Sequence, residues 1–167
     1  RQPGLFQQVK NILKETGVEP HFLELEITEG TAMSCLESAI ATTRQFQALG
    51  IRVSLDDFGT GFSSLNYLRL LPVDTLKIDR SFITDLVSDK DNLSIVAAII
   101  AMSHKLGMTV LAEGVEYNNQ YRLLQKLNCD EVQGYLVSMP IPPDEIETLL
   151  LSDFGFSVEE KVAALTH

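Results

Sequence analysis

Helical and strand-like segments alternate from end to end of this sequence, and this alternation constrains the fold more than any other feature. Helical spacing of apolar residues occurs at residues 5–13, 36–46, 93–100, 121–127 and 146–151, with a shorter helix expected from Ser64 to about Leu71. Runs typical of strands lie between them, at residues 22–27, 52–55, 75–78, 108–112 and 131–135. Because the connections are only a few residues long, such strands pair in parallel through right-handed helical crossovers. The sequence therefore predicts an α/β fold.

Side-chain alternation within the strands narrows the architecture. The first three strands have one apolar face, and their other face carries Glu26, Asp56 and Lys77 near the carboxyl ends. Glu113 and Gln133 stand in the same place on the last two strands. Polar groups at the carboxyl end of every strand are typical of a TIM barrel, whose catalytic groups ring that mouth. An open doubly wound sheet would gather its site at one switch point. We therefore predict a barrel.

The chain accounts for five strands of an eight-stranded barrel. Such a barrel typically needs ~250 residues, and this chain has 167. We expect it to supply about the last five βα units, as a barrel domain over residues 1–151 that is incomplete at its N-terminus. Residues 152–167 are expected to form a C-terminal extension that is helical from Val158 to Leu165.

Charge and composition limit the partners and the compartment. The chain carries 13 basic and 23 acidic side chains, a formal net charge of −10. A nucleic acid polymer or an anionic membrane would need a basic face, so neither is expected as a partner. No apolar run approaches the ~20 residues that span a bilayer, and Cys35 and Cys129 lack disulfide-framework or zinc-site spacing. We expect this domain to be cytoplasmic. The larger protein that contains it can be anchored to a membrane through another of its domains.

Two adjacent carboxylates, Asp56 and Asp57, follow an apolar strand and precede a loop with two glycines. Carboxylates are hard oxygen ligands suited to Mg²⁺ or Mn²⁺, and a loop rich in glycine can close over a substrate. Two ions about 3.5–4 Å apart would let Asp56 bridge them while Asp57 reaches one. A plainer alternative is that the pair caps the next helix or binds a lysine. Lys77, likewise, can be a structural ion-pair partner of Glu26 or Glu113.

Five ordered motifs in the first 150 residues or so resemble those of EAL domains, the bacterial phosphodiesterases that open cyclic di-GMP to linear pGpG. They are Glu26-Ile27-Thr28-Glu29, residues 56–65, Leu76-Lys77-Ile78-Asp79, residues 112–116 and Gln133-Gly134-Tyr135. The family fold is a modified TIM barrel, which agrees with the argument from side-chain alternation.

The resemblance implies a role for each matching residue. It places Glu26, Asp56 and Asp57 at a site for two Mg²⁺ or Mn²⁺ ions. Lys77 would lie near the attacking water or the phosphate, and Glu113 would act as the base or as a water-mediated metal partner. Calcium is expected to inhibit, because it takes more ligands at longer distances than Mg²⁺.

The remaining matches concern the loop and the nucleotide. Glu29 is implied to brace the loop over residues 57–64, although a carboxylate there can also simply favour a helix N-terminus. Gln133, Gly114, Glu116 and Tyr135 are implied to contact cyclic di-GMP. A homodimer is expected to use the helix that follows the loop.

The sequence departs from the family in one respect. No Glu-Ala-Leu motif and no Asn-x-Ser motif precedes Glu26, where the family has them. We interpret this as truncation upstream of Arg1, so the chain alone is expected to be inactive. Three hypotheses stay open: a metal-dependent cyclic di-GMP phosphodiesterase within a multidomain signalling protein, a receptor or scaffold that does not cut the nucleotide, and an unrelated metal-dependent barrel enzyme. The complete set of downstream motifs favours the enzyme.

Overall fold

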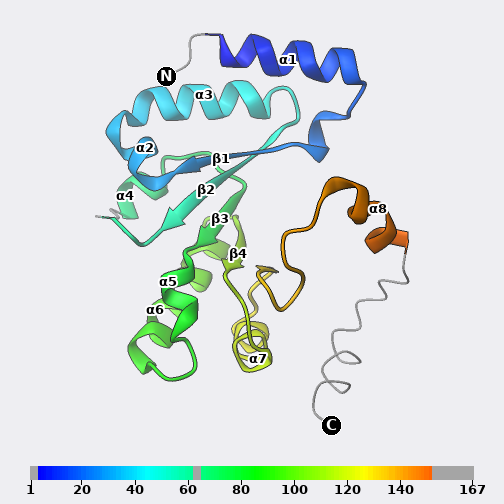
Figure 1. Cartoon of the computed structure of the whole chain (residues 1–167). Helices are drawn as coiled ribbons and strands as arrows, with labels where there is room; N and C mark the ends of the chain where they lie inside the picture. Colours follow the sequence, from blue (N-terminus) through cyan, green and yellow to red (C-terminus); the bar gives the residue numbers. More distant parts are fainter. Residues whose placement is uncertain (1–3, 62–64, 152–167) are drawn as a thin grey trace.

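Five parallel strands form one sheet in sequence order, which confirms the predicted α/β class. The computed structural model describes residues 4–61 and 65–151 (Figure 1). The strands are β1 Glu24–Thr28, β2 Arg52–Phe58, β3 Thr75–Ile78, β4 Thr109–Glu113 and β5 Glu131–Gln133. The predicted C-terminal extension lies outside the described ranges.

Helices connect the strands, and each expected helix within the described ranges is present. They are α1 Leu5–Thr16, α2 Glu29–Ser34, α3 Leu36–Gln47, α4 Leu65–Leu68, α5 Arg80–Thr84, α6 Lys90–Lys105, α7 Asn118–Lys126 and α8 Pro143–Leu151. The short helices α2 and α5 were not predicted, because six and five residues are too few to show an apolar stripe. Each begins directly after a strand, where the side chain of Thr28 or Asp79 accepts a backbone N–H of the first turn. None of the described helices has the length and apolar character to cross a bilayer.

Four of the five strands differ from the prediction at their boundaries, β4 by a shift of one residue. β1 begins two residues late because Pro20–Phe22 form a 3₁₀ turn. β2 continues three residues further, through both aspartates to Phe58. β5 ends at Gln133 because the chain then turns back, and the N–H of Leu136 donates to the carbonyl of Val115.

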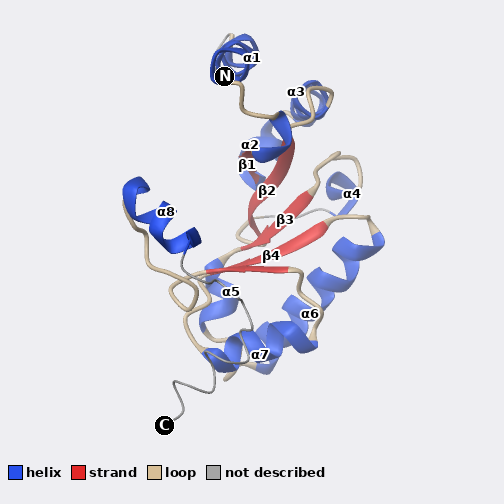
Figure 2. Ribbon diagram, turned by 90° about the vertical axis from the view of Figure 1, so that its right-hand side faces the viewer, coloured by secondary structure: helices blue, strands red, loops and turns tan. Residues whose placement is uncertain are grey.

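The core lies between the sheet and the helices that follow its strands. Helices α3, α4 and α6 lie along one side of the sheet (Figure 2), and α1 lies outside α3, with Phe6 against Phe46. The most buried apolar side chains include Leu55, Leu76, Ile100 and Val110, each at most 2% exposed. Each such side chain contributes roughly 1.5–3 kcal/mol through burial. The apolar faces of the strands thus point as the sequence predicts, and the polar face is left for the site.

The amino ends of the strands are joined by two equivalent aspartates. Asp74 immediately precedes β3 and accepts the N–H of Val53 at 2.8 Å and the side-chain amide of Gln47. Asp130 immediately precedes β5 and accepts the N–H of Val110 at 2.8 Å, while its carboxylate lies 2.8 Å from Nε2 of His104.

In each case the aspartate at the start of one strand contacts the preceding strand, and it also contacts the helix that leads into that preceding strand. Because these contacts form at the amino edge of the sheet, they fix strand register away from the carboxyl ends.

Candidate active site at the carboxyl ends of the strands

Four charged side chains from four adjacent strands converge on one point. The ammonium of Lys77 on β3 lies 2.6 Å from Oε1 of Glu26, 3.1 Å from Oδ1 of Asp56 and 2.8 Å from Oε1 of Glu113. Strand register explains the meeting. Ser54 pairs with Glu26 and with Thr75, so residues two places further along β2 and β3 share the same face.

Lys77 is the most buried member of this group, with a side chain only 6% exposed. Burial by itself would lower the pKa of Lys77. The contacts with Glu113, Glu26 and Asp56 outweigh burial and raise the pKa above its ordinary value. The ammonium therefore stays charged among the carboxylates. The ion pairs that we considered as the plainer interpretation of Lys77 are present, and they hold it at the same mouth as the acidic residues.

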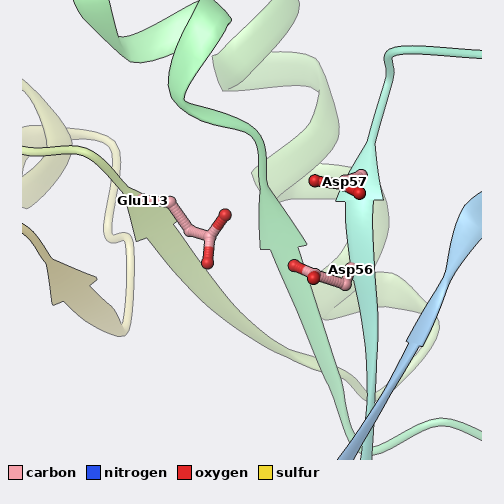
Figure 3. A group of neighbouring side chains, drawn as sticks. All are labelled: Asp56, Asp57 and Glu113. Carbon is pink, nitrogen blue, oxygen red and sulfur yellow. The ribbon is translucent and has the colours of Figure 1, made fainter.

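A β-bulge lets two adjacent aspartates face the same place. Leu55 pairs with Leu76 and Phe58 with Ile78, so β2 has one more residue than β3 between these pairs. Asp57 sits in the bulge with φ 57°, a left-handed conformation that aspartate tolerates better than most residues. Successive strand residues normally face opposite sides, but a bulge re-aims a side chain. Asp57 therefore joins Asp56 and Glu113 (Figure 3).

Asp56, Asp57 and Glu113 form a group of oxygen donors that fits a divalent cation. One carboxylate oxygen from each lies within 4.8 Å of the others. Oδ1 of Asp56 is buried and, among the parts of the chain that the structure describes, has no hydrogen-bond partner. Its 3.1 Å contact with Lys77 is an ion pair outside hydrogen-bonding geometry. Hard cations such as Mg²⁺ or Mn²⁺ prefer this oxygen chemistry.

Glu26 and Glu113 lie differently with respect to this group of three carboxylates. Glu26, predicted as a metal ligand, is half exposed and hydrogen-bonded to Lys77, outside the group of three carboxylates. Glu113, predicted as a base or water-mediated partner, lies within that group.

Glu29 contacts the loop after the aspartates. It is buried, begins α2, and accepts the N–H of Gly59 through Oε2 at 3.0 Å. The side chain of Thr60 donates to the carbonyl of Asp57 at 2.9 Å. The geometry thus contains both arrangements considered for Glu29, a carboxylate at a helix start and one against the loop.

The four residues predicted to contact the nucleotide lie beyond Glu113, on the ends of β4 and β5. The carbonyl of Gln133 accepts the N–H of Val115, and the side chain of Tyr135 is exposed. The carboxylate of Glu116 lies 2.8 Å from Nη2 of Arg80, whose stem packs against Gly114.

Arg80 was not singled out from the sequence. Its only signal was its position directly after Leu76-Lys77-Ile78-Asp79.

Comparison with known families identifies the domain. The model of the EAL domain matches residues 1–140. This chain belongs to the EAL domain family. The five parallel βα units are therefore part of a TIM-barrel-like domain, as predicted.

Two curated relatives come from Pseudomonas aeruginosa. The bifunctional diguanylate cyclase/cyclic di-GMP phosphodiesterase MucR is 43% identical over 143 residues, which cover 86% of this chain and 21% of MucR. The cyclic di-GMP phosphodiesterase NbdA is 45% identical over 147 residues, covering 88% and 19%. The EAL domain chain therefore spans about a fifth of the length of these relatives.

Solved structures agree with this assignment. The PaMucR phosphodiesterase in complex with c-di-GMP matches with a TM-score of 0.83 and 43% identity, over 87% of this chain and 59% of that one. Klebsiella pneumoniae BlrP1 with manganese and the same nucleotide matches with a TM-score of 0.75 and 27% identity, over 81% and 34%. BlrP1 was also solved with calcium and the nucleotide, and that structure matches with a TM-score of 0.75 and 28% identity, over 80% and 34%.

Proposed function

We propose that this EAL domain chain forms the metal-binding part of a phosphodiesterase that hydrolyses cyclic di-GMP to linear pGpG. The observation that carries the proposal is the group of Asp56, Asp57 and Glu113 beside the buried ammonium of Lys77. Relatives named as cyclic di-GMP phosphodiesterases, and a solved complex with the nucleotide, support the choice of substrate.

The donor set suits Mg²⁺ or Mn²⁺, and the manganese complex of BlrP1 supports the second. When bound, two such ions lower the pKa of water and neutralise charge on the phosphate. Asp56, Asp57 and Glu26 hold the metals in this proposal. Asp56, whose Oδ1 is buried beside the ammonium of Lys77, would be a ligand of these ions together with its neighbour Asp57.

Lys77 and Glu113 have separate catalytic roles in this proposal. The Lys77 ammonium stays charged and offsets negative charge on the phosphate. Glu113 accepts a proton from the attacking water, or orients it, at a carboxylate held 2.8 Å from Lys77. Glu29 braces the loop after Asp57 through its hydrogen bond to Gly59.

The nucleotide is held at the rim beyond the metals. Gln133, Gly114, Glu116 and Tyr135 contact cyclic di-GMP in this proposal, and the exposed ring of Tyr135 is free to stack on a base. Since the curated relatives are about five times as long as the match, we propose that further domains of a larger cytoplasmic signalling protein control the site. We also propose that the protein forms a homodimer through the helix that follows the loop over residues 57–64.

The test uses the natural protein that contains this chain, assayed by nucleotide chromatography with Mg²⁺ or Mn²⁺. We expect cyclic di-GMP to become linear pGpG, and Asp56→Ala or Glu26→Ala to abolish turnover. Asp85→Ala, which removes an exposed carboxylate at the end of α5, is the matched control and should retain activity. Wild-type rates in either site variant would refute the proposal. Tight binding of the nucleotide without hydrolysis would favour a receptor.

A further inference from the structure

The segment over residues 57–60 is held in an unusual conformation by contacts on three sides. Asp57 has φ 57° and Gly59 has φ 98°, both in the left-handed region. The carbonyl of Asp57 accepts the N–H and the hydroxyl of Thr60. The N–H of Gly59 donates to Glu29. Between these, the side chain of Phe58 is buried in the core.

The ring of Phe82 makes the third contact with this segment, at Gly59. A Cβ added to Gly59 would lie 2.6 Å from Cε2 and 2.9 Å from Cζ of that ring. Such distances are well inside contact range, so the ring occupies the space that a side chain at Gly59 would need. Phe82 itself packs against the hydrophobic core from α5, which follows the strand that carries Lys77.

We propose that Phe82 is a positioning residue for Asp57. Its ring packs against Gly59, while Glu29 accepts the N–H of the same residue, so the bulge keeps its left-handed turn. Without that turn, Asp57 would face away from Asp56 and Glu113, because adjacent strand residues alternate. This inference rests on the proposed metal site, to which it adds the residue that keeps one ligand in place.

A double-mutant cycle in the natural protein tests the contact. We expect Phe82→Ala to weaken Mn²⁺ binding about 10- to 100-fold, the usual effect of removing a residue that orients a metal ligand. Gly59→Ala should weaken it as well, since its methyl group meets the ring and alanine is strained at φ 98°. In the double variant the methyl group enters the space left by the ring, so Mn²⁺ should bind more tightly than to Gly59→Ala alone. Independent, additive effects would overturn the proposal.

Phe82→Leu provides a milder variant in case the alanine variant fails to fold. Ile83→Val is its matched control, because Ile83 is fully buried on the same helix. Both should lower the melting temperature, but only Phe82→Leu should weaken Mn²⁺ binding, as measured by electron paramagnetic resonance. Equal Mn²⁺ affinity in the two variants would show that Phe82 is merely structural.

Hydrogen exchange at the Gly59 amide separates this inference from the proposed function. We expect Phe82→Leu to speed exchange at Gly59, and Ile83→Val to leave it unchanged. If the wild-type protein bound no Mn²⁺, the proposed function would fail whatever the exchange result. If Mn²⁺ bound normally but Gly59 exchanged at the same rate in all three proteins, the role of Phe82 would fail alone.

Discussion

The ammonium of Lys77 lies 2.8 Å from the carboxylate of Glu113, and the two side chains come from adjacent strands. This contact joins the candidate base to the residue that would face the phosphate. Glu113 also belongs to the group with Asp56 and Asp57, so the positive charge of Lys77 lies beside the carboxylates of that group. The first prediction concerns this charge.

Lys77→Met should lower turnover by at least about 100-fold, because a fixed positive charge beside the reacting phosphate is lost. Unfolding free energy should fall by about 2 kcal/mol, less than for a fully buried pair because Glu26 is half exposed. Chromatographic assays and urea denaturation measure the two effects. Lys105→Met, at the exposed end of α6, is the control and should change neither. A variant with full turnover would remove Lys77 from the mechanism.

The pH dependence of the Lys77 ion pairs follows from its raised pKa. A raised pKa means that the folded protein holds the proton more tightly than the unfolded chain. The stabilisation is therefore fully present below the unfolded pKa of lysine and is lost only as pH rises through the higher folded pKa. Melting temperatures of wild type and Lys77→Met should differ up to strongly alkaline pH. Convergence of the two curves near neutral pH would contradict this.

Calcium should inhibit hydrolysis of cyclic di-GMP while still binding at the site. Ca²⁺ takes six to eight oxygen ligands at about 2.3–2.6 Å, whereas Mg²⁺ needs six at about 2.0–2.1 Å, so the attacking water would be misplaced. The BlrP1 complex with calcium and nucleotide is consistent with binding. Competition assays against Mn²⁺ measure the effect. Undiminished turnover in calcium alone would show that the ions do not position the nucleophile.

Glu29→Ala should reduce activity about 10- to 100-fold by removing the acceptor for the Gly59 N–H. Fold and oligomeric mass should stay largely unchanged. Glu29→Gln keeps an acceptor oxygen at the same reach, so it should retain more activity than the alanine variant. Circular dichroism melts and light scattering accompany the assay. If Glu29→Ala unfolds the domain instead, Glu29 is a structural residue.

Asp130→Asn should destabilise the protein at neutral pH but not in acid. Partial burial alone would raise the pKa of Asp130, but the contacts with His104 and the Val110 amide lower it below its usual value. A lowered pKa contributes stability that is present above the unfolded pKa and lost as pH falls through the folded one. The melting temperatures should therefore converge at low pH. Glu131→Gln, an exposed neighbour, should show no such pattern.

The sequence predicted the parts of this site that depend on strand parity. Apolar and polar residues alternate along these strands, and the polar positions near the carboxyl ends hold Glu26, Asp56, Lys77 and Glu113. The alternation is visible in the sequence alone, so it predicts that these four side chains share a face. The strand order follows from the short connections between strands and helices. The α/β class and the barrel-like architecture could therefore be predicted without coordinates.

The arrangement around Asp57 could not be predicted in the same way. Parity places adjacent residues on opposite faces, and only pairing with β3 creates the bulge that brings Asp57 beside Asp56. The contact between Gly59 and Phe82 likewise joins residues 23 positions apart, as their numbers show. Local patterns carry no information about such contacts, because they arise when separate units pack together.

Asp74 and Asp130 both act at the amino end of the sheet, whereas the candidate site lies at its carboxyl end. Each carboxylate accepts a backbone N–H near the start of the neighbouring strand, from Val53 or Val110. Neither carboxylate belongs to the candidate site. Evolution and protein engineering can therefore vary the residues at the opposite ends while strand alignment is preserved. A library confined to those ends should retain the scaffold in most of its members, and a library at the two aspartates should not.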